Sequence, residues 1–86
     1  MISDNPIIHN ACIIVEGIAF EITNDNNIKK ILASDIYNPN YKASFVLRNH
    51  DLILSVSSFR EKEREQVLLE AVHINSSILI DEVQNA

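Results

Sequence analysis

The chain has a single glycine, Gly17, which separates two apolar stretches near its start. Glycine adopts positive φ without steric cost, so Glu16-Gly17 is typical of the two-residue loop of a tight β-hairpin. In that hairpin an apolar residue faces another at each inward position: Val15 faces Ile18, Ile13 faces Phe20, and Ala11 faces Ile22. The sequence therefore predicts a sheet with one buried face in the first quarter of the chain.

A short helix is predicted next, over about residues 25–35. The polar run of residues 24–27 can cap backbone N–H groups, and Ile28, Ile31 and Leu32 follow at helical spacing. Asn38-Pro39-Asn40 would end this helix, because the residue before a proline avoids the helical conformation.

Two interpretations of residues 42–59 give different topologies. As a hairpin with Asn49-His50 at its tip, residues 42–57 have one apolar face, with four facing pairs: Arg48 with Asp51, Leu47 with Leu52, Phe45 with Leu54, and Ala43 with Val56. The alternative makes residues 42–59 helical and residues 66–74 a strand. We favour the hairpin, because Asn49, His50 and Asp51 would weaken the interior of a helix.

A second helix is predicted over residues 62–71, which are nearly all strong helix formers. Ser58-Phe59-Arg60-Glu61 fits a capping box, in which Ser58 accepts a hydrogen bond from the backbone N–H of Glu61. Residues 78–80 fit either a last helical turn or a short strand, and both interpretations stay open.

These elements predict an α+β fold of two layers in the order ββαββα, with a four-stranded, largely antiparallel sheet and two helices on one face. The 86 residues form a single domain, with flexible ends at residues 1–9 and 84–86. Four apolar residues would lie on the sheet face away from the helices, where a homodimer or a tight partner complex would cover them: Ile14, Ala19, Val46 and Ile53.

The charge balance argues against nucleic acid and membranes as partners. Twelve acidic and seven basic residues give a net charge of −5, which repels phosphate backbones and anionic lipids and favours a partner with a basic surface. Cys12 is the only cysteine and the start resembles no secretion signal, so we expect a cytoplasmic protein. Isoleucine and asparagine are abundant, and A/T-rich codons encode both. Such a composition is typical of a bacterium with low G+C content or of one of its phages.

No cofactor, metal or catalytic site is predicted. Four residues could bind zinc through an imidazole or a thiol: His9, Cys12, His50 and His73. They lack the paired spacing that is typical of zinc sites. Cys12 would face Glu21, whose carboxylate raises a thiol pKa and so disfavours the nucleophilic thiolate. The few cations are too scattered for a phosphate-binding patch, and Tyr37, Tyr41 and Phe45 are better explained as loop packing than as a base-stacking platform.

The acidic residues of the second helix alternate with basic ones, as on a solvated helix face, and Glu61 and Glu65 could also dock a basic partner. The sequence thus predicts a non-enzymatic protein-interaction module: a small acidic regulator, inhibitor or antitoxin-like protein. The alternative function is a homo-oligomeric domain that binds a small ligand or metal between subunits, through His9, Cys12 or His73.

Overall fold

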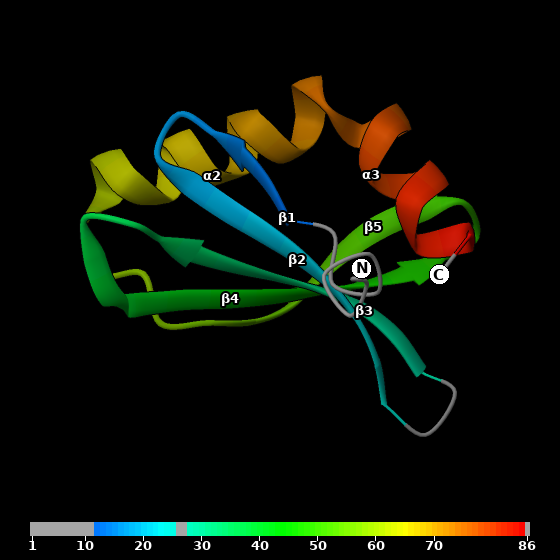
Figure 1. Cartoon of the computed structure of the whole chain (residues 1–86). Coiled ribbons are helices and arrows are strands. Elements are labelled where there is room, and N and C mark those ends of the chain that lie inside the picture. The colour runs from blue at the N-terminus through cyan, green and yellow to red at the C-terminus, as the bar shows by residue number, and fades with distance from the viewer. Residues whose placement is uncertain (1–11, 26–27, 86) are drawn as a thin grey trace, which may run out of the picture.

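The computed structural model describes residues 12–25 and 28–85, with the side chains of Asn24 and Asp25 left aside. Within these residues, five antiparallel strands in sequential order are followed by two helices (Figure 1). The elements are β1 (Cys12–Val15), β2 (Ile18–Asp25), β3 (Ile28–Asp35), β4 (Asn38–Arg48), β5 (Asp51–Ser57), α2 (Lys62–Ile74) and α3 (Ser76–Gln84). The α+β class and the antiparallel sheet are confirmed, whereas the four-stranded ββαββα arrangement is wrong.

The first hairpin has the predicted register. Val15 pairs with Ile18 and Ile13 with Phe20, while Ala11 lies outside the described residues. Glu16 and Gly17 have φ values of 54° and 76°, the two positive values that a two-residue turn of this kind requires. Positive φ at Glu16 is uncommon for a residue with a Cβ.

The predicted helix over residues 25–35 is wrong, because Ile28–Asp35 forms β3, the central strand of the sheet. Ile31 and Ala33 are buried on the helix side, and Leu32 between them points to the opposite face. An apolar residue on each face of a strand places apolar residues three and four positions apart, which imitates helical spacing. Pairing with both β2 and β4 decides the structure in favour of a strand.

The hairpin of β4 and β5 is confirmed over the first three of its four predicted facing pairs, and the alternative with a helix over 42–59 and a strand over 66–74 is wrong. Arg48 pairs with Asp51 and Phe45 with Leu54. The register then shifts, so that Val56 pairs with Ser44 instead of the predicted Ala43. This bulge leaves Ser55 as the extra residue of β5 and moves Val56 to the face away from the helices.

Ser58 does not cap α2, which corrects the predicted capping box. The residue that precedes α2 is Glu61, and no side chain caps the helix. The Ser58 hydroxyl oxygen instead accepts from the backbone N–H of Lys42 at 2.9 Å and lies 2.8 Å from the carbonyl oxygen of Asn40, to which it donates. Ser58 therefore ties the end of β5 to β4.

Residues 76–84 are helical, which settles the open interpretation of residues 78–80 as helix α3. Asn75 separates the two helices, and its side-chain amide donates to the carbonyl oxygen of Ala71 at 2.9 Å. Of the ends predicted to be flexible, Gln84 belongs to α3, while residues 1–9 and Ala86 lie outside the described part of the chain.

Both helices cover the same face of the sheet, and the core lies between the two layers (Figure 1). The fully buried side chains come from β2, β3, α2 and α3, and include Ile18, Phe20, Ile31, Leu68, Leu79 and Val83. The opposite face of the sheet has no cover among the described residues.

Candidate interaction surface

The described part of the chain leaves one sheet face, the one opposite the helices, without cover, and it is called the open face below. It consists of the alternate residues of all five strands, together with the residue that the bulge turns outward: Cys12, Ile14, Ala19, Glu21, Thr23, Ile28, Lys30, Leu32, Ser34, Lys42, Ser44, Val46, Arg48, Asp51, Ile53 and Val56.

Large apolar side chains are exposed on the open face along the whole width of the sheet. Among the described strands, six large apolar side chains are exposed, and five of them lie on this face: Ile14, Ile28, Leu32, Ile53 and Val56. Ile14 and Val56, at opposite edges of the sheet, are 62% and 64% exposed. A hollow of about 190 Å³ beside the bulge is lined by Leu32, Ser44 and Val56, among other residues. Exposed apolar area gathered on one face is typical of an interaction surface.

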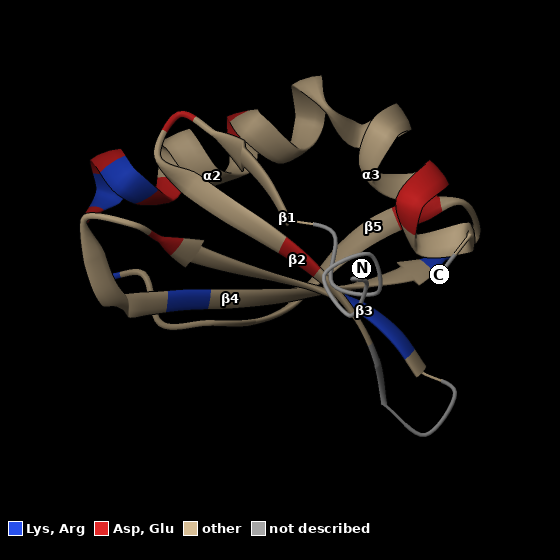
Figure 2. Cartoon of the chain, in the orientation of Figure 1, with Lys and Arg blue, Asp and Glu red and all other residues tan. Residues whose placement is uncertain are grey.

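The open face carries charges on its central strand and on both sides of it. Lys30 and Leu32 lie on the central strand β3, and Glu21 pairs with Leu32 from β2. Lys42 on β4 pairs with Ser34, two residues along β3 from Leu32. Figure 2 shows the same sparse pattern, with the sheet carrying few charges and the start of α2 carrying many. Within residues 12–25 and 28–85, the one ion pair is that of Arg64 and Asp35, on the other side of the sheet.

The four predicted interface residues of the sheet all lie on the open face: Ile14, Ala19, Val46 and Ile53. The structure does not bring the other two, Glu61 and Glu65, to this face, because they lie at the start of α2. Sequence reasoning missed Leu32, because β3 was assigned to a helix, and Val56, because no residue of β5 signals the bulge. The alternation of Ile31 and Ala33 with Lys30 and Ser34 is the signal that favours a strand at Leu32.

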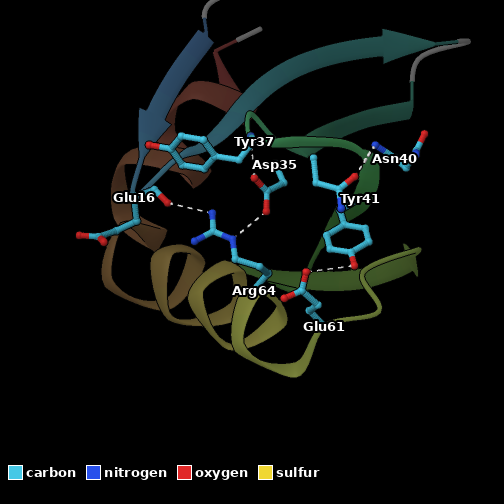
Figure 3. Close-up of polar contacts among 8 residues, drawn as sticks. Glu16, Asp35, Tyr37, Asn40, Tyr41, Glu61 and Arg64 are labelled. Carbon is cyan, nitrogen blue, oxygen red and sulfur yellow. Dashed lines mark hydrogen bonds and ion pairs between the residues drawn. The ribbon is translucent and has the colours of Figure 1, made fainter.

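Asp35 and Arg64 form a polar cluster that joins the start of α2 to two turns of the sheet (Figure 3). The Nε of Arg64 donates to Oδ2 of Asp35 at 2.7 Å, and the backbone N–H of Tyr37 donates to Oδ1 at 2.9 Å. Nη2 of Arg64 reaches the carbonyl oxygen of Glu16 at 3.2 Å, and the guanidinium carbon lies 5.8 Å from the centre of the Tyr37 ring. One side chain thus holds three segments together.

Asp35 is almost fully buried and is held in its ionised form by this cluster. Burial raises the pKa of the carboxyl, but the hydrogen bonds from Arg64 and from the backbone of Tyr37, with the charge of Arg64, outweigh it and leave the pKa below its ordinary value. A carboxylate with both oxygens engaged is poorly suited to general acid–base work. We interpret the cluster as a structural anchor for α2.

Tyr41 and Glu61 extend the contacts of the α2 start towards β4. The Tyr41 hydroxyl donates to Oε1 of Glu61 at 3.3 Å, and the Tyr41 ring lies 5.5 Å from that of Phe59. Burial, followed by the charge and hydrogen bond of Glu61, raises the pKa of the Tyr41 hydroxyl. These contacts place Glu61 beside the sheet on the helix side.

The residues considered as metal ligands lie far apart. Cys12 is exposed on the open face, His50 sits at the tip of the β4–β5 hairpin, and His73 lies on α2 beyond the other face. His9 lies outside the described residues. Within the described ranges, the structure groups no three His, Cys, Asp or Glu side chains as a metal site would need.

Neither a known protein family, nor a curated protein, nor a solved structure matches this chain. No helix of the described residues is long and apolar enough to cross a membrane.

Proposed function

We propose that the chain is a small, non-enzymatic protein-interaction module that forms a homodimer through the open face. The observation that carries the proposal is the gathering of exposed apolar side chains on this face, from β1 to β5. Burying this face against a second copy removes those side chains from water and gives a small domain a second apolar contact layer. Two sheets stacked in this way pack about 10 Å apart with their strands roughly aligned.

Glu21 and Lys42 on the open face favour a second copy as its cover, whereas Lys30 on β3 would oppose it by meeting Lys30 of the partner subunit. Glu21 on β2 and Lys42 on β4 flank the central strand on opposite sides. A two-fold axis that runs along β3 stacks each β2 over the other copy's β4, which places Glu21 two residues along the strand from Lys42 of the partner subunit. Because such an interface is isologous, the same attraction occurs twice.

The dimer would act by covering the surface of another protein, as a regulator, inhibitor or antitoxin-like protein does. The overall charge of −5 supports a partner with a basic surface. The one ion pair among the described residues serves to anchor the fold. We therefore assign the molecule a binding role rather than a catalytic one. An exposed lone thiol at Cys12 suits a reducing compartment such as the cytoplasm.

Charge reversal across the two-fold axis tests the dimer. Glu21→Lys and Lys42→Glu should each raise the dimer dissociation constant roughly threefold to thirtyfold, the effect of two partly exposed pairs of about 0.3–1 kcal/mol each. The double variant should restore the wild-type value, because each lysine again meets a glutamate. Sedimentation equilibrium at low salt measures all three. A double variant no tighter than either single variant would contradict this arrangement of the two copies.

A further inference from the structure

A groove on the helix side of the sheet runs beside the edge strand β5. It has a volume of about 430 Å³, and apolar side chains from both layers line it: Phe45, Leu52, Leu54, Leu69, Val72 and Ile80. Leu54 and Leu69 remain 39% and 44% exposed on its two walls. A volume of this size lies in the range of small-ligand and peptide pockets, which is about 300–1,000 Å³.

The strand beside the groove has a free edge. Within residues 12–25 and 28–85, β5 is the last strand of the sheet and pairs only with β4, so every second backbone N–H and C=O group of Asp51–Ser57 points away from the sheet. Edge strands are commonly protected by lysine or proline, and β5 contains neither. Its bulge at Ser55 leaves Asp51–Leu54 as a regular stretch for pairing.

The groove and the free edge together suit an extended segment. A strand added to β5 would lie about 4.8 Å from it, and alternate side chains of that strand would point to the helix side. There they would enter the groove between Leu54 and Leu69. Backbone pairing to an edge with side chains in an adjacent groove is the usual mode of β-strand addition.

Acidic side chains stand near one end of the groove. Asp51 lines the groove at the start of β5, but its pairing with Arg48 places its side chain on the same face as Ile53. At the other end, Glu65 and Glu61 continue the stripe of α2 that contains Leu69, at steps of four residues. Glu61 is held beside the end of β5 by its contact with Tyr41 on β4. Among the described residues that line the groove there is no lysine or arginine, and His73 carries its one imidazole.

From these observations we propose that the groove beside β5 binds an extended segment of another protein, with apolar side chains on one face and a lysine or arginine towards the end that meets the start of α2. A second copy of this chain is disfavoured here, because its own β5 would bring Asp51 and the net charge of −5 to an acidic groove. The groove lies on the helix side, so a dimer through the open face leaves it accessible, and the two proposals stand independently.

A synthetic peptide of the length of β5 tests the proposal, with three valines alternating with threonines between a lysine at each end. It should bind saturably below about 1 mM, at least about tenfold more tightly than a matched peptide with glutamate at each end. Salt near 1 M, where the Debye length is about 3 Å, should reduce that preference. Hydrogen exchange should slow at the backbone amides of β5 when the lysine peptide is bound.

Leu54→Lys and Ile53→Lys form a matched pair of variants, since the two residues are neighbours on β5 with 39% and 46% exposure on opposite faces. Leu54→Lys should weaken binding of the lysine peptide more than tenfold, and Ile53→Lys less than twofold. Equal effects of the two variants, equal affinity for the two peptides, or no saturation up to about 1 mM would overturn the proposal. Protection of the β5 amides that rises with protein concentration in the absence of peptide would assign this edge to a second copy and overturn it too.

Discussion

The two faces of this sheet come from the same strands but differ in burial: the helices cover one face, and the other is exposed. On β3, Ile31 is fully buried under the helices, while its neighbour Leu32 is 39% exposed on the open face. On β2, buried Phe20 stands between Ala19 and Glu21, which face the other way. Because side chains alternate along a strand, one face can provide the stability of the fold while the composition of the other is free to serve binding.

Alanine variants of β3 should show the largest difference in stability between the two faces. Ile31→Ala removes a fully buried side chain and should cost about 2–5 kcal/mol of unfolding free energy, whereas the same change at Leu32 should cost about 1 kcal/mol or less. Urea denaturation measures both, at a protein concentration low enough to keep the chain monomeric. Similar losses for the two variants would mean that the open face is covered by the protein's own chain.

The anchor between α2 and the sheet should make the helix-covered face sensitive to acid. Asp35→Asn should cost about 1.5–3 kcal/mol at neutral pH, the range for hydrogen bonds to charged groups. The folded-state pKa of Asp35 is lowered, so its ionised form stabilises the fold above the unfolded pKa of about 4, and this contribution is lost as the pH falls through the folded-state value.

The difference between wild type and Asp35→Asn should therefore shrink below about pH 4, in denaturation measured as a function of pH. Asp51→Asn, at an exposed carboxylate of β5, is the control and should stay within about 0.5 kcal/mol of wild type. If the difference in unfolding free energy between Asp35→Asn and wild type stayed constant from neutral to acidic pH, the ionised form of Asp35 would contribute nothing to stability.

Of the three features tested by substitution, the buried face of β3, the anchor of α2 and the turn that joins β1 to β2, the turn should affect stability least. Gly17→Val should cost about 1–2 kcal/mol, mainly because a β-branched residue is strained at a φ of 76°. Its Cβ would also lie 2.5 Å from the Tyr37 ring and 3.2 Å from Nη2 of Arg64, so these two side chains would have to shift. Glu16→Asn, at a φ of 54°, should instead gain a few tenths of a kcal/mol, because asparagine tolerates this conformation. Thermal unfolding checks both variants, and a Gly17→Val protein as stable as wild type would refute the strain at this turn.

The sequence predicted the parts of the fold in which local pattern and tertiary pairing agree. Gly17 determines the register of the first hairpin, and Arg48 and Asp51 flank the tip of the second. Strand β3 was missed because Ile28, Ile31 and Leu32 have the same spacing in a helix as in a strand that is apolar on both faces. Only its two neighbouring strands distinguish these cases, and a local window does not contain them.

The candidate surface was predicted in part for the same reason. Ile14, Ala19, Val46 and Ile53 follow from alternation along correctly assigned strands. Val56 was missed because the bulge at Ser55 reverses its face without a proline or glycine to mark it. The predicted helix cap at Ser58 was wrong because its hydroxyl group forms hydrogen bonds with the backbone of β4. This contact depends on how the chain returns from β5.

Light scattering of the wild-type protein across micromolar concentrations tests the central claim, that the open face is an interface between two copies. The wild type should have twice the 9.7 kDa mass of one chain, and the double variant Val46→Glu with Ile53→Lys should be a folded monomer. Ile78→Lys, at an exposed residue of α3, should remain a dimer. A wild type that stays monomeric and soluble, with the double variant equally folded, would contradict the account.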